Sequence, residues 1–402
     1  MSVTLARALK GDLCAGCGLC AGISDGAARM EIDEGGFARP VIDTNMGREE
    51  ERLIAASCPA VTLASWAEVG NTHPYWGPYQ EVLTGHATDE SLRRGASSGA
   101  AISGLLIHAL ESGQVEGVVQ TAADPADPRR TITQVSRTAA DITACFGSRY
   151  GPSSPLADIG RLLTHTGRFA FVGKPCDASA LRALGRVDAR VAERFPLILS
   201  FFCAGVPSIR GTDQILTDLG VAAGDLADFR YRGDGWPGYA TATRHDGSIE
   251  RMSYEESWGN RLSKHVQFRC KICPDAVGGS ADIACADAWY GGESGYPQFE
   301  EMDGRSLIMV RSEAGAALLA SAIKAGDVAA EPLALGEIDL MQPSQARRKR
   351  LIASRLMALA FTFQPMPSFK GVSIGKAAQR AGVGETVKSF LGLVRRVVQG
   401  RK

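Results

Sequence analysis

The stretch Phe169-Ala-Phe-Val-Gly-Lys-Pro-Cys-Asp-Ala-Ser-Ala-Leu-Arg-Ala-Leu184 places an unbroken apolar run directly before a segment with helical spacing. Its opening residues, 169–173, predict a buried strand, and residues 178–184 predict the helix that follows it. The same order recurs at residues 197–203 and 209–219. Two successive strand–helix units predict an α/β arrangement for the middle of the chain.

Weaker patterns extend this prediction in both directions. Short alternating runs separated by Gly- and Asp-containing turns predict an antiparallel hairpin at residues 228–232, 240–245 and 249–253. Further strands are expected at residues 117–121, 133–136 and 306–311 and around Cys285, with helices at residues 101–110 and 313–324. The polar residues 123–130 are expected to form a turn, and the aromatic, Pro-containing residues 73–79 a linker.

Composition and charge narrow the class of protein. The 402 residues are 45% hydrophobic and 22% charged, with 44 basic and 44 acidic side chains. These values exclude a wholly disordered or fibrous chain, and zero formal net charge gives no long-range field toward nucleic acid. No apolar segment reaches the ~20 residues of a membrane-spanning helix, and no secretory signal is recognisable. We therefore expect a cytoplasmic protein that binds no nucleic acid.

Four cysteines form what we call the first cysteine set. Three follow one another at a spacing of three in Cys14-Ala-Gly-Cys17-Gly-Leu-Cys20, and the fourth precedes a proline at Cys58. Small intervening residues allow one tight loop to wrap a cubane, which is the ligand pattern of a [4Fe–4S] cluster. A structural zinc site is the alternative, but zinc sites usually assemble from two separated cysteine pairs. The spacing favours iron and sulfur.

The second cysteine set is scattered along the chain. Cys270 and Cys273 form a Cys-x-x-Cys, whereas Cys176 and Cys203 each follow an apolar run. A thiolate between a strand end and a helix N-terminus suits a metal ligand, but spacing alone leaves a second cluster and ordinary buried thiols equally open. Cys285 is expected to be a small core residue, and the sequence assigns no role to Cys145.

A Gly- and Ser-rich segment precedes the expected helix at residues 101–110. Ser97, Ser98 and Gly99 can present hydroxyl and backbone N–H groups to a phosphate. The residues alone favour the alternative, an ordinary serine cap of the helix. A second segment of this type contains Gly147, Ser148, Arg149 and Tyr150.

The chain ends in a basic amphipathic pattern. Apolar residues from Val387 to Val398 recur at helical spacing beside Lys388, Arg395, Arg396, Arg401 and Lys402. Such a helix can touch an anionic membrane. Packing of its apolar face on the protein itself or on a sister subunit of a homo-oligomer is the interpretation we favour.

Six stretches, in this order, resemble one protein family: GASSGA (95–100), CFGSRYGPS (145–153), FVGKPCDASALRAL (171–184), FFCAGVPS (201–208), FRYRGDGWPG (229–238) and CKICPDAVGGSADIACADAW (270–289). The resemblance is to the coenzyme F420 hydrogenase/dehydrogenase β-subunit family, including its 7-hydroxymethyl chlorophyll a reductase and ferredoxin-dependent divinyl chlorophyllide reductase branches. It covers about residues 10–330.

The resemblance implies an α+β fold. A small ferredoxin-like iron–sulfur module (residues 1–65) would precede an α/β flavin-binding core with mixed sheets (80–165 and 166–330) and a helical tail (331–402). It also implies FAD and two [4Fe–4S] clusters, the first ligated by Cys14, Cys17, Cys20 and Cys58 and the second by Cys176, Cys203, Cys270 and Cys273. The residues expected to bind FAD are Ser97, Ser98, Gly99, Gly147, Ser148, Arg149, Tyr150 and Lys174.

The function implied is that of an iron–sulfur flavoprotein oxidoreductase. A low-potential donor such as ferredoxin would supply single electrons, and FAD would collect two for reduction of a small molecule or second coenzyme. Tyr150, His265 and Asp287 are candidate proton donors because they lie near the motifs. The alternative functions are a non-catalytic electron-transfer subunit of a larger complex and a zinc-bound structural module.

Overall fold

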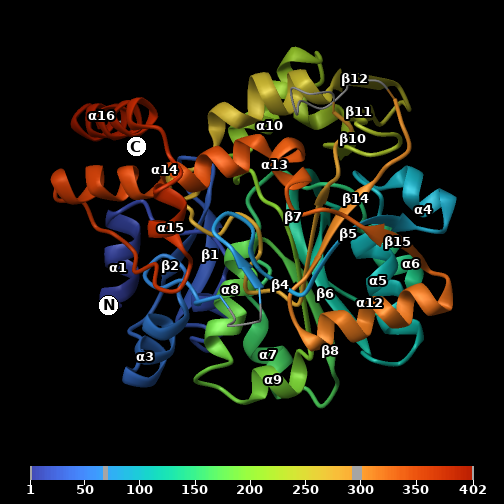
Figure 1. Ribbon diagram of the computed structural model, residues 1–402, viewed down its shortest axis with the longest axis horizontal. Helices are drawn as coiled ribbons and strands as arrows, with labels where there is room; N and C mark the ends of the chain where they lie inside the picture. The colour runs from blue at the N-terminus through green and yellow to red at the C-terminus, as the bar shows by residue number, and fades with distance from the viewer. Residues whose placement is uncertain (1, 67–70, 292–300, 401–402) are drawn as a thin grey trace.

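The computed structural model describes residues 2–66, 71–291 and 301–400 (Figure 1), so Arg401 and Lys402 of the predicted basic tail lie outside the described residues. A mixed eight-stranded sheet, of order β15-β5-β14-β13-β9-β8-β6-β7, lies at the centre. Its strands are β5 (Glu81–Ala87), β6 (Gly117–Asp124), β7 (Asp127–Ser136), β8 (Phe169–Gly173), β9 (Leu197–Phe201), β13 (Ile283–Asp287), β14 (Ser306–Val310) and β15 (Val328–Pro332). Strands β13, β9, β8 and β6 are parallel, and the remaining pairs are antiparallel.

Helices cover both faces of this sheet. One face packs on α5 (Ala101–Glu111), α6 (Ala139–Ala144) and α12 (Glu313–Ala325), and the other on α7 (Ile159–Thr164), α8 (Pro175–Leu184) and α9 (Arg190–Arg194). Within β8, Ala170 and Val172 face the first layer, whereas Phe169 and Phe171 face the second. Burial on both faces is why this strand is apolar throughout rather than alternating.

The two ends of the chain meet on one side of the molecule, at the left of Figure 1. The N-terminal segment contains α1 (Val3–Lys10), α2 (Leu19–Gly22), β1 (Ala28–Ile32), β2 (Ala38–Ile42) and α3 (Arg48–Ser57); the C-terminal segment contains α13 (Glu337–Met341), α14 (Pro343–Phe361), α15 (Ile374–Ala378) and α16 (Val383–Val398). Leu13 and Ala60 share a buried cluster with Leu359 and Leu393. We call residues 2–66 and 336–400 together the cap.

The tail helix packs within the chain, as the sequence favours. Leu393 of α16 is buried against α14, and the rings of Phe390 and Phe361 lie 5.8 Å apart. Elsewhere, α10 (Ile209–Asp218) packs near a three-stranded antiparallel sheet of β10 (Leu226–Arg230), β11 (Tyr239–Arg244) and β12 (Ile249–Ser253). The sequence predicts a hairpin here, and the structure has two antiparallel pairings, β10 with β11 and β11 with β12. Two further short helices are α4 (Glu90–Gly95) and α11 (Phe268–Lys271).

Two local predictions are wrong. Residues 73–79 are not a linker, because β3 (Asn71–His73) and β4 (Gly77–Tyr79) form a hairpin whose Trp76 is completely buried. The expected turn at residues 123–130 is shorter, because β6 runs to Asp124 and β7 begins at Asp127. Pro128 is tolerated there because β7 is the edge strand of the sheet.

No helix within the described ranges combines the length and the apolarity needed to cross a bilayer.

Candidate functional site

The first cysteine set converges in the cap. Cys14, Cys17 and Cys20 lie on the loop and short helix that follow α1, and Cys58 ends α3; all four line one small cavity. Left-handed backbone at Gly16 and Gly18 gives the loop its tight path. A Cβ atom on Gly18 would lie 2.8 Å from the backbone nitrogen of Ala157, so the loop also needs glycine to approach the core.

Burial makes these thiols poor anions when nothing binds them. Desolvation raises the pKa of all four, and neighbouring thiols of the set add to the rise for Cys17, Cys20 and Cys58. The pKa of Cys58 reaches about 12. A group that binds them as thiolates would replace these protons and supply the missing positive charge. This donor set fits a [4Fe–4S] cluster.

The second cysteine set also comes together, although its members span almost a hundred residues. Cys176 lies in the first turn of α8, Cys203 follows β9, and Cys270 and Cys273 flank the end of α11. Burial is the main cause that raises the pKa of Cys203 to about 12, and the nearby Cys270 and Cys273 contribute to this rise. The Cys270 Sγ accepts hydrogen bonds from the Val206 backbone N–H at 3.4 Å and from Gln267 Nε2 at 3.5 Å.

Across residues 2–66, 71–291 and 301–400, no three His, Cys, Asp or Glu side chains converge in a way that would hold a single metal ion.

A cavity of about 330 Å³ opens beside the second cysteine set. Of the residues expected to bind FAD, it is lined by Ser97, Ser98, Gly147, Ser148, Arg149, Tyr150 and Lys174. Gly99 does not line it; a Cβ atom there would lie 2.7 Å from both the Gly85 oxygen and the Ser306 nitrogen, so close packing explains this glycine. Cys203, Cys145 and Cys285 lie in the cavity wall.

The two Gly- and Ser-rich segments meet at the cavity. The Ser148 backbone N–H donates a hydrogen bond to Ser97 Oγ, and the Ser98 hydroxyl donates to the Arg305 carbonyl at 3.1 Å. The residue that caps α5 is Ala100, and no side chain forms a capping hydrogen bond there. The serine-cap alternative is therefore wrong.

One cation in this wall has unused hydrogen-bonding capacity. Arg149 Nη1 donates to the Phe229 carbonyl at 2.8 Å, whereas its buried Nε has no partner among the described residues. Burial lowers the pKa of Arg149, because no carboxylate compensates for desolvation strongly enough. An anionic group of the kind found in a nucleotide cofactor would satisfy this side chain, so the cavity wall is suited to an anionic ligand.

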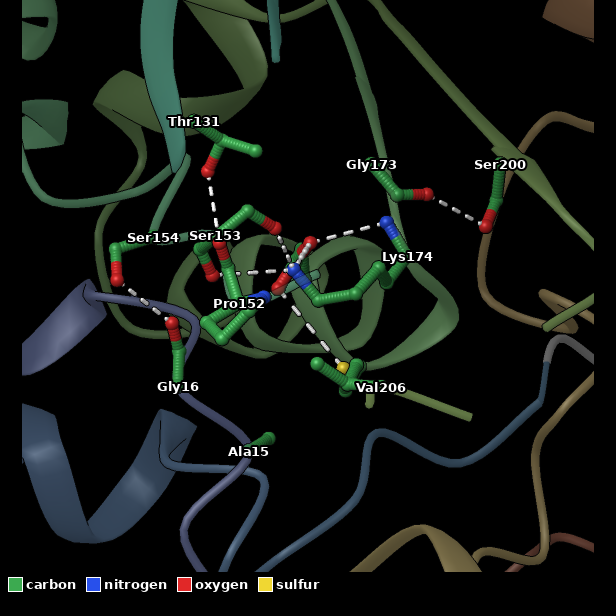
Figure 2. Close-up of polar contacts among 12 residues, drawn as sticks. Ala15, Gly16, Thr131, Pro152, Ser153, Ser154, Gly173, Lys174, Ser200 and Val206 are labelled. Atoms are coloured by element: carbon green, nitrogen blue, oxygen red, sulfur yellow. Dashed lines mark hydrogen bonds and ion pairs between the residues drawn. The ribbon is translucent and has the colours of Figure 1, made fainter. Parts of the chain in front are cut away.

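Lys174 is more fully engaged than the sequence suggests. Its Nζ lies 2.8 Å from Asp177 Oδ2 and donates to Ser153 Oγ at 2.6 Å. Figure 2 shows that the adjacent Ser154 reaches the other way and donates to the Gly16 carbonyl at 2.9 Å. Residues 152–154 thus connect the loop of the first cysteine set to the turn that contains Cys176.

The candidate proton donors are separated. Tyr150 and Asp287 line the cavity, whereas His265 does not; its Nε2 lies 3.0 Å from Gln214 Oε1 on α10. Sequence reasoning missed the partner of Asp287. The guanidinium of Arg232 contacts both carboxylate oxygens at 2.8 and 2.9 Å and lies over the rings of Tyr254 and Trp289. The only sequence signal for this buried pair is the Arg in the FRYRGDGWPG stretch.

The sequence matches two family models, which describe the two parts of the coenzyme F420 hydrogenase/dehydrogenase β-subunit. The model of the N-terminal part matches residues 82–159, and the model of the C-terminal part matches residues 166–335. The whole of the cap lies outside these ranges.

Related proteins agree with these matches. The coenzyme F420 hydrogenase subunit β of Methanothermobacter thermautotrophicus is 24% identical over 296 residues, which cover 70% of this chain and 98% of that relative. The subunit of the same name from Methanococcus voltae is 26% identical over 261 residues, covering 62% and 84%. A chain in a structure of the F420-reducing [NiFe] hydrogenase complex from Methanosarcina barkeri shares the fold, with a TM-score of 0.56 and 20% identity over 74% of this chain and 98% of that one.

Proposed function

The chain belongs to the coenzyme F420 hydrogenase/dehydrogenase β-subunit family, and we propose that it is an iron–sulfur flavoprotein that transfers electrons as a subunit of a larger redox complex. The relatives support this function, because they are named as subunits of a hydrogenase. A subunit of this kind passes electrons to or from partner chains rather than completing a reaction alone.

One observation carries the proposal. Cys203 lies beside Cys270 and Cys273 and also lines the large cavity, so the proposed cluster site and the proposed flavin site share a wall. The bound clusters would supply one-electron steps and FAD would supply the pairing of two electrons. The eight thiols of the two sets would hold the clusters, and Arg149 with the Ser97–Ser148 contact would bind and orient the anionic part of FAD.

A second candidate is a reductase that works without a partner subunit. The first cysteine set favours it, because it lies outside the matched family ranges and gives this chain an additional place for electron entry. A ferredoxin-like donor would then reduce the chain, and a small molecule or second coenzyme would bind in the cavity. Tyr150 would be the proton donor, since His265 lies outside the cavity and Arg232 engages both carboxylate oxygens of Asp287. A chlorophyll-type substrate stays a prediction from the resemblance.

The test is the cofactor content of anaerobically purified protein. We expect about eight iron, about eight acid-labile sulfide and one FAD per chain, with the visible spectrum of a flavin and iron–sulfur clusters. Zinc without sulfide or flavin would contradict the proposal. Co-purification with a larger chain would favour the subunit, whereas donor-dependent reduction of a small molecule by the isolated protein would favour the reductase.

A further inference from the structure

Arg269 is a buried cation with little visible compensation. Its side chain is 2% exposed, and its Nη2 donates one hydrogen bond to the Pro59 carbonyl at 2.9 Å. Two further nitrogens, Nε and Nη1, are buried without a hydrogen-bond partner among the described residues. The ring of Phe369 lies 5.1 Å from the guanidinium.

Such an arrangement is unstable unless something anionic lies nearby. Removing a guanidinium from water costs several kcal/mol, and a single carbonyl with an aromatic ring returns only part of that cost. Buried arginines are therefore normally paired with carboxylates or phosphates. The unpartnered nitrogens of Arg269 indicate an anionic group at this place.

The position of Arg269 identifies that group. Arg269 donates its hydrogen bond to Pro59, which directly follows Cys58 of the first cysteine set. Arg269 itself directly precedes Cys270 of the second cysteine set. Burial raises the pKa of Cys58 and of Cys273, and the positive charge of Arg269 opposes the rise in both cases. The guanidinium therefore lies between the two sets.

A second buried side chain connects the same two sites. Gln267 is 3% exposed, and its Nε2 lies 3.4 Å from the Ala15 carbonyl in the first loop and 3.5 Å from the Cys270 Sγ. Its Oε1 accepts a hydrogen bond from Arg39 Nη1 at 3.1 Å, which fixes the orientation of the amide. The junction between the sites is thus polar, ordered and closed to solvent.

We propose that Arg269 is a counter-ion shared by the two cluster sites and that it sets the reduction potentials of both. The inference rests on the proposed function, because it requires a [4Fe–4S] cluster at each set. A one-electron carrier reduces each cluster, and the carrier is oxidised in the same step. The reduced cluster has one more negative charge, and no proton is transferred. A buried positive charge stabilises the reduced form at both sites, so both potentials rise together.

The experiment compares Arg269→Gln with Arg311→Gln in the cofactor-loaded protein. Potentials are measured by anaerobic redox titration, with visible absorption and electron paramagnetic resonance to separate the clusters. In Arg269→Gln we expect the reduced-to-oxidised ratio of both clusters to fall about tenfold at a fixed potential, a shift of about 59 mV for a one-electron couple. Arg269→Lys should restore most of the ratio.

Arg311 is the matched control. It is 1% exposed and has a buried Nε without a described partner, but it donates to the carbonyls of Trp76, Pro78 and Val277, none of which is next to a cysteine of either set. Arg311→Gln should lower thermal stability and leave both potentials unchanged. A merely structural role for Arg269 would give the same result as this control.

Three outcomes overturn the inference. Unchanged potentials in an Arg269→Gln protein with full iron content would remove the counter-ion role and leave the proposed function standing. A shift confined to one cluster would show that the charge is not shared. Absence of iron from the wild-type protein would refute the proposed function and the inference with it. If Arg269→Gln does not load iron, Arg269→His provides the test of the counter-ion role. In that variant both potentials should depend on pH near neutrality, whereas the potentials of the wild type should not.

Discussion

The family-matched core and the cap are built in different ways. The described residues between 82 and 335 are arranged around one large sheet, and they contain most of the cavity lining and the second cysteine set. The cap joins segments from the two ends of the chain, and it contains the first cysteine set between short helices. The core thus forms most of the cavity and holds the second cysteine set beside it, whereas the cap holds the first cysteine set and adds Gln342 and Gln345 to the cavity wall.

This difference indicates what the chain adds to the family-matched core. The first cysteine set contacts the core through polar side chains, including Gln267 and the Ser154 hydroxyl, and its loop also places Cys17 in a buried apolar cluster with β6 and β8 of the central sheet. Under the proposed function, the cap lengthens the electron path outward from the cavity. The comparison therefore predicts that each cysteine set can be lost separately.

The largest expected effect is the loss of iron when one cysteine of either set is replaced, in two separate variants. Cys14→Ala should lose about half of the iron and keep the flavin, because its set lies in the cap. Cys273→Ala should lose the other half and also change the flavin spectrum, because Cys203 of the same set lines the cavity. Iron, sulfide and flavin analyses measure both effects.

The control for these variants is Cys285→Ala, a buried cysteine of the cavity wall that belongs to neither set. It should keep the full iron content. Complete loss of iron in Cys14→Ala would show that the two sites are not independent and would break the comparison.

An intermediate effect is expected from the apolar contact between the ends of the chain. Leu359 of α14 is completely buried in the cap cluster, so Leu359→Ala should lower the free energy of unfolding by about 2–5 kcal/mol. Leu391→Ala on α16, where the side chain is 57% exposed, should change it by less than about 0.5 kcal/mol. Urea unfolding measures both values.

The same pair of variants sharpens the comparison further. Leu359→Ala should release iron from the first set at lower urea than from the second, because the cap loses its support before the core. Simultaneous release would mean that cap and core unfold as one unit.

The smallest effect lies at the edge of the core, on strand β7. Hydrogen bonds from Arg129 hold the pKa of Asp127 below its ordinary value, so the pair stabilises the folded state at neutral pH and loses this contribution as the pH falls through the lowered pKa. Asp127→Asn should cost up to about 1 kcal/mol at neutral pH and nothing at about pH 2. Urea unfolding at the two pH values tests this; an equal cost at both would exclude the ion pair as its cause.

Local sequence patterns predicted those parts of the fold that local interactions determine. Strands β8 and β9 with helices α8 and α10 follow from apolar runs and helical spacing. The hairpin containing Trp76 was mistaken for a linker, because Gly and Pro beside aromatic residues are typical of loops as well as of tightly turned core segments.

The candidate site likewise has residues that the sequence predicted and residues that it did not. Cysteine spacing predicted the first thiol set, whereas the family resemblance was needed to predict the second set and the residues that line the cavity. The contacts of Gln267 and Arg269 and the pairing of Arg232 with Asp287 carry no local signal, because the partners lie far apart in the sequence. Pairing between distant segments depends on the packing of the whole chain, which a single sequence does not state.

The pairing of the two ends has a consequence for how the protein is made. Thr62 forms a β-bridge with Ser368, whose backbone N–H donates to the Val61 carbonyl at 2.7 Å. The ribosome synthesises the N-terminal partner first, and about three hundred residues must follow before the other arrives. Because contacts this distant in sequence form late, the cap is completed only after the C-terminal segment has left the ribosome, and the N-terminal part of the cap must wait for that partner throughout synthesis.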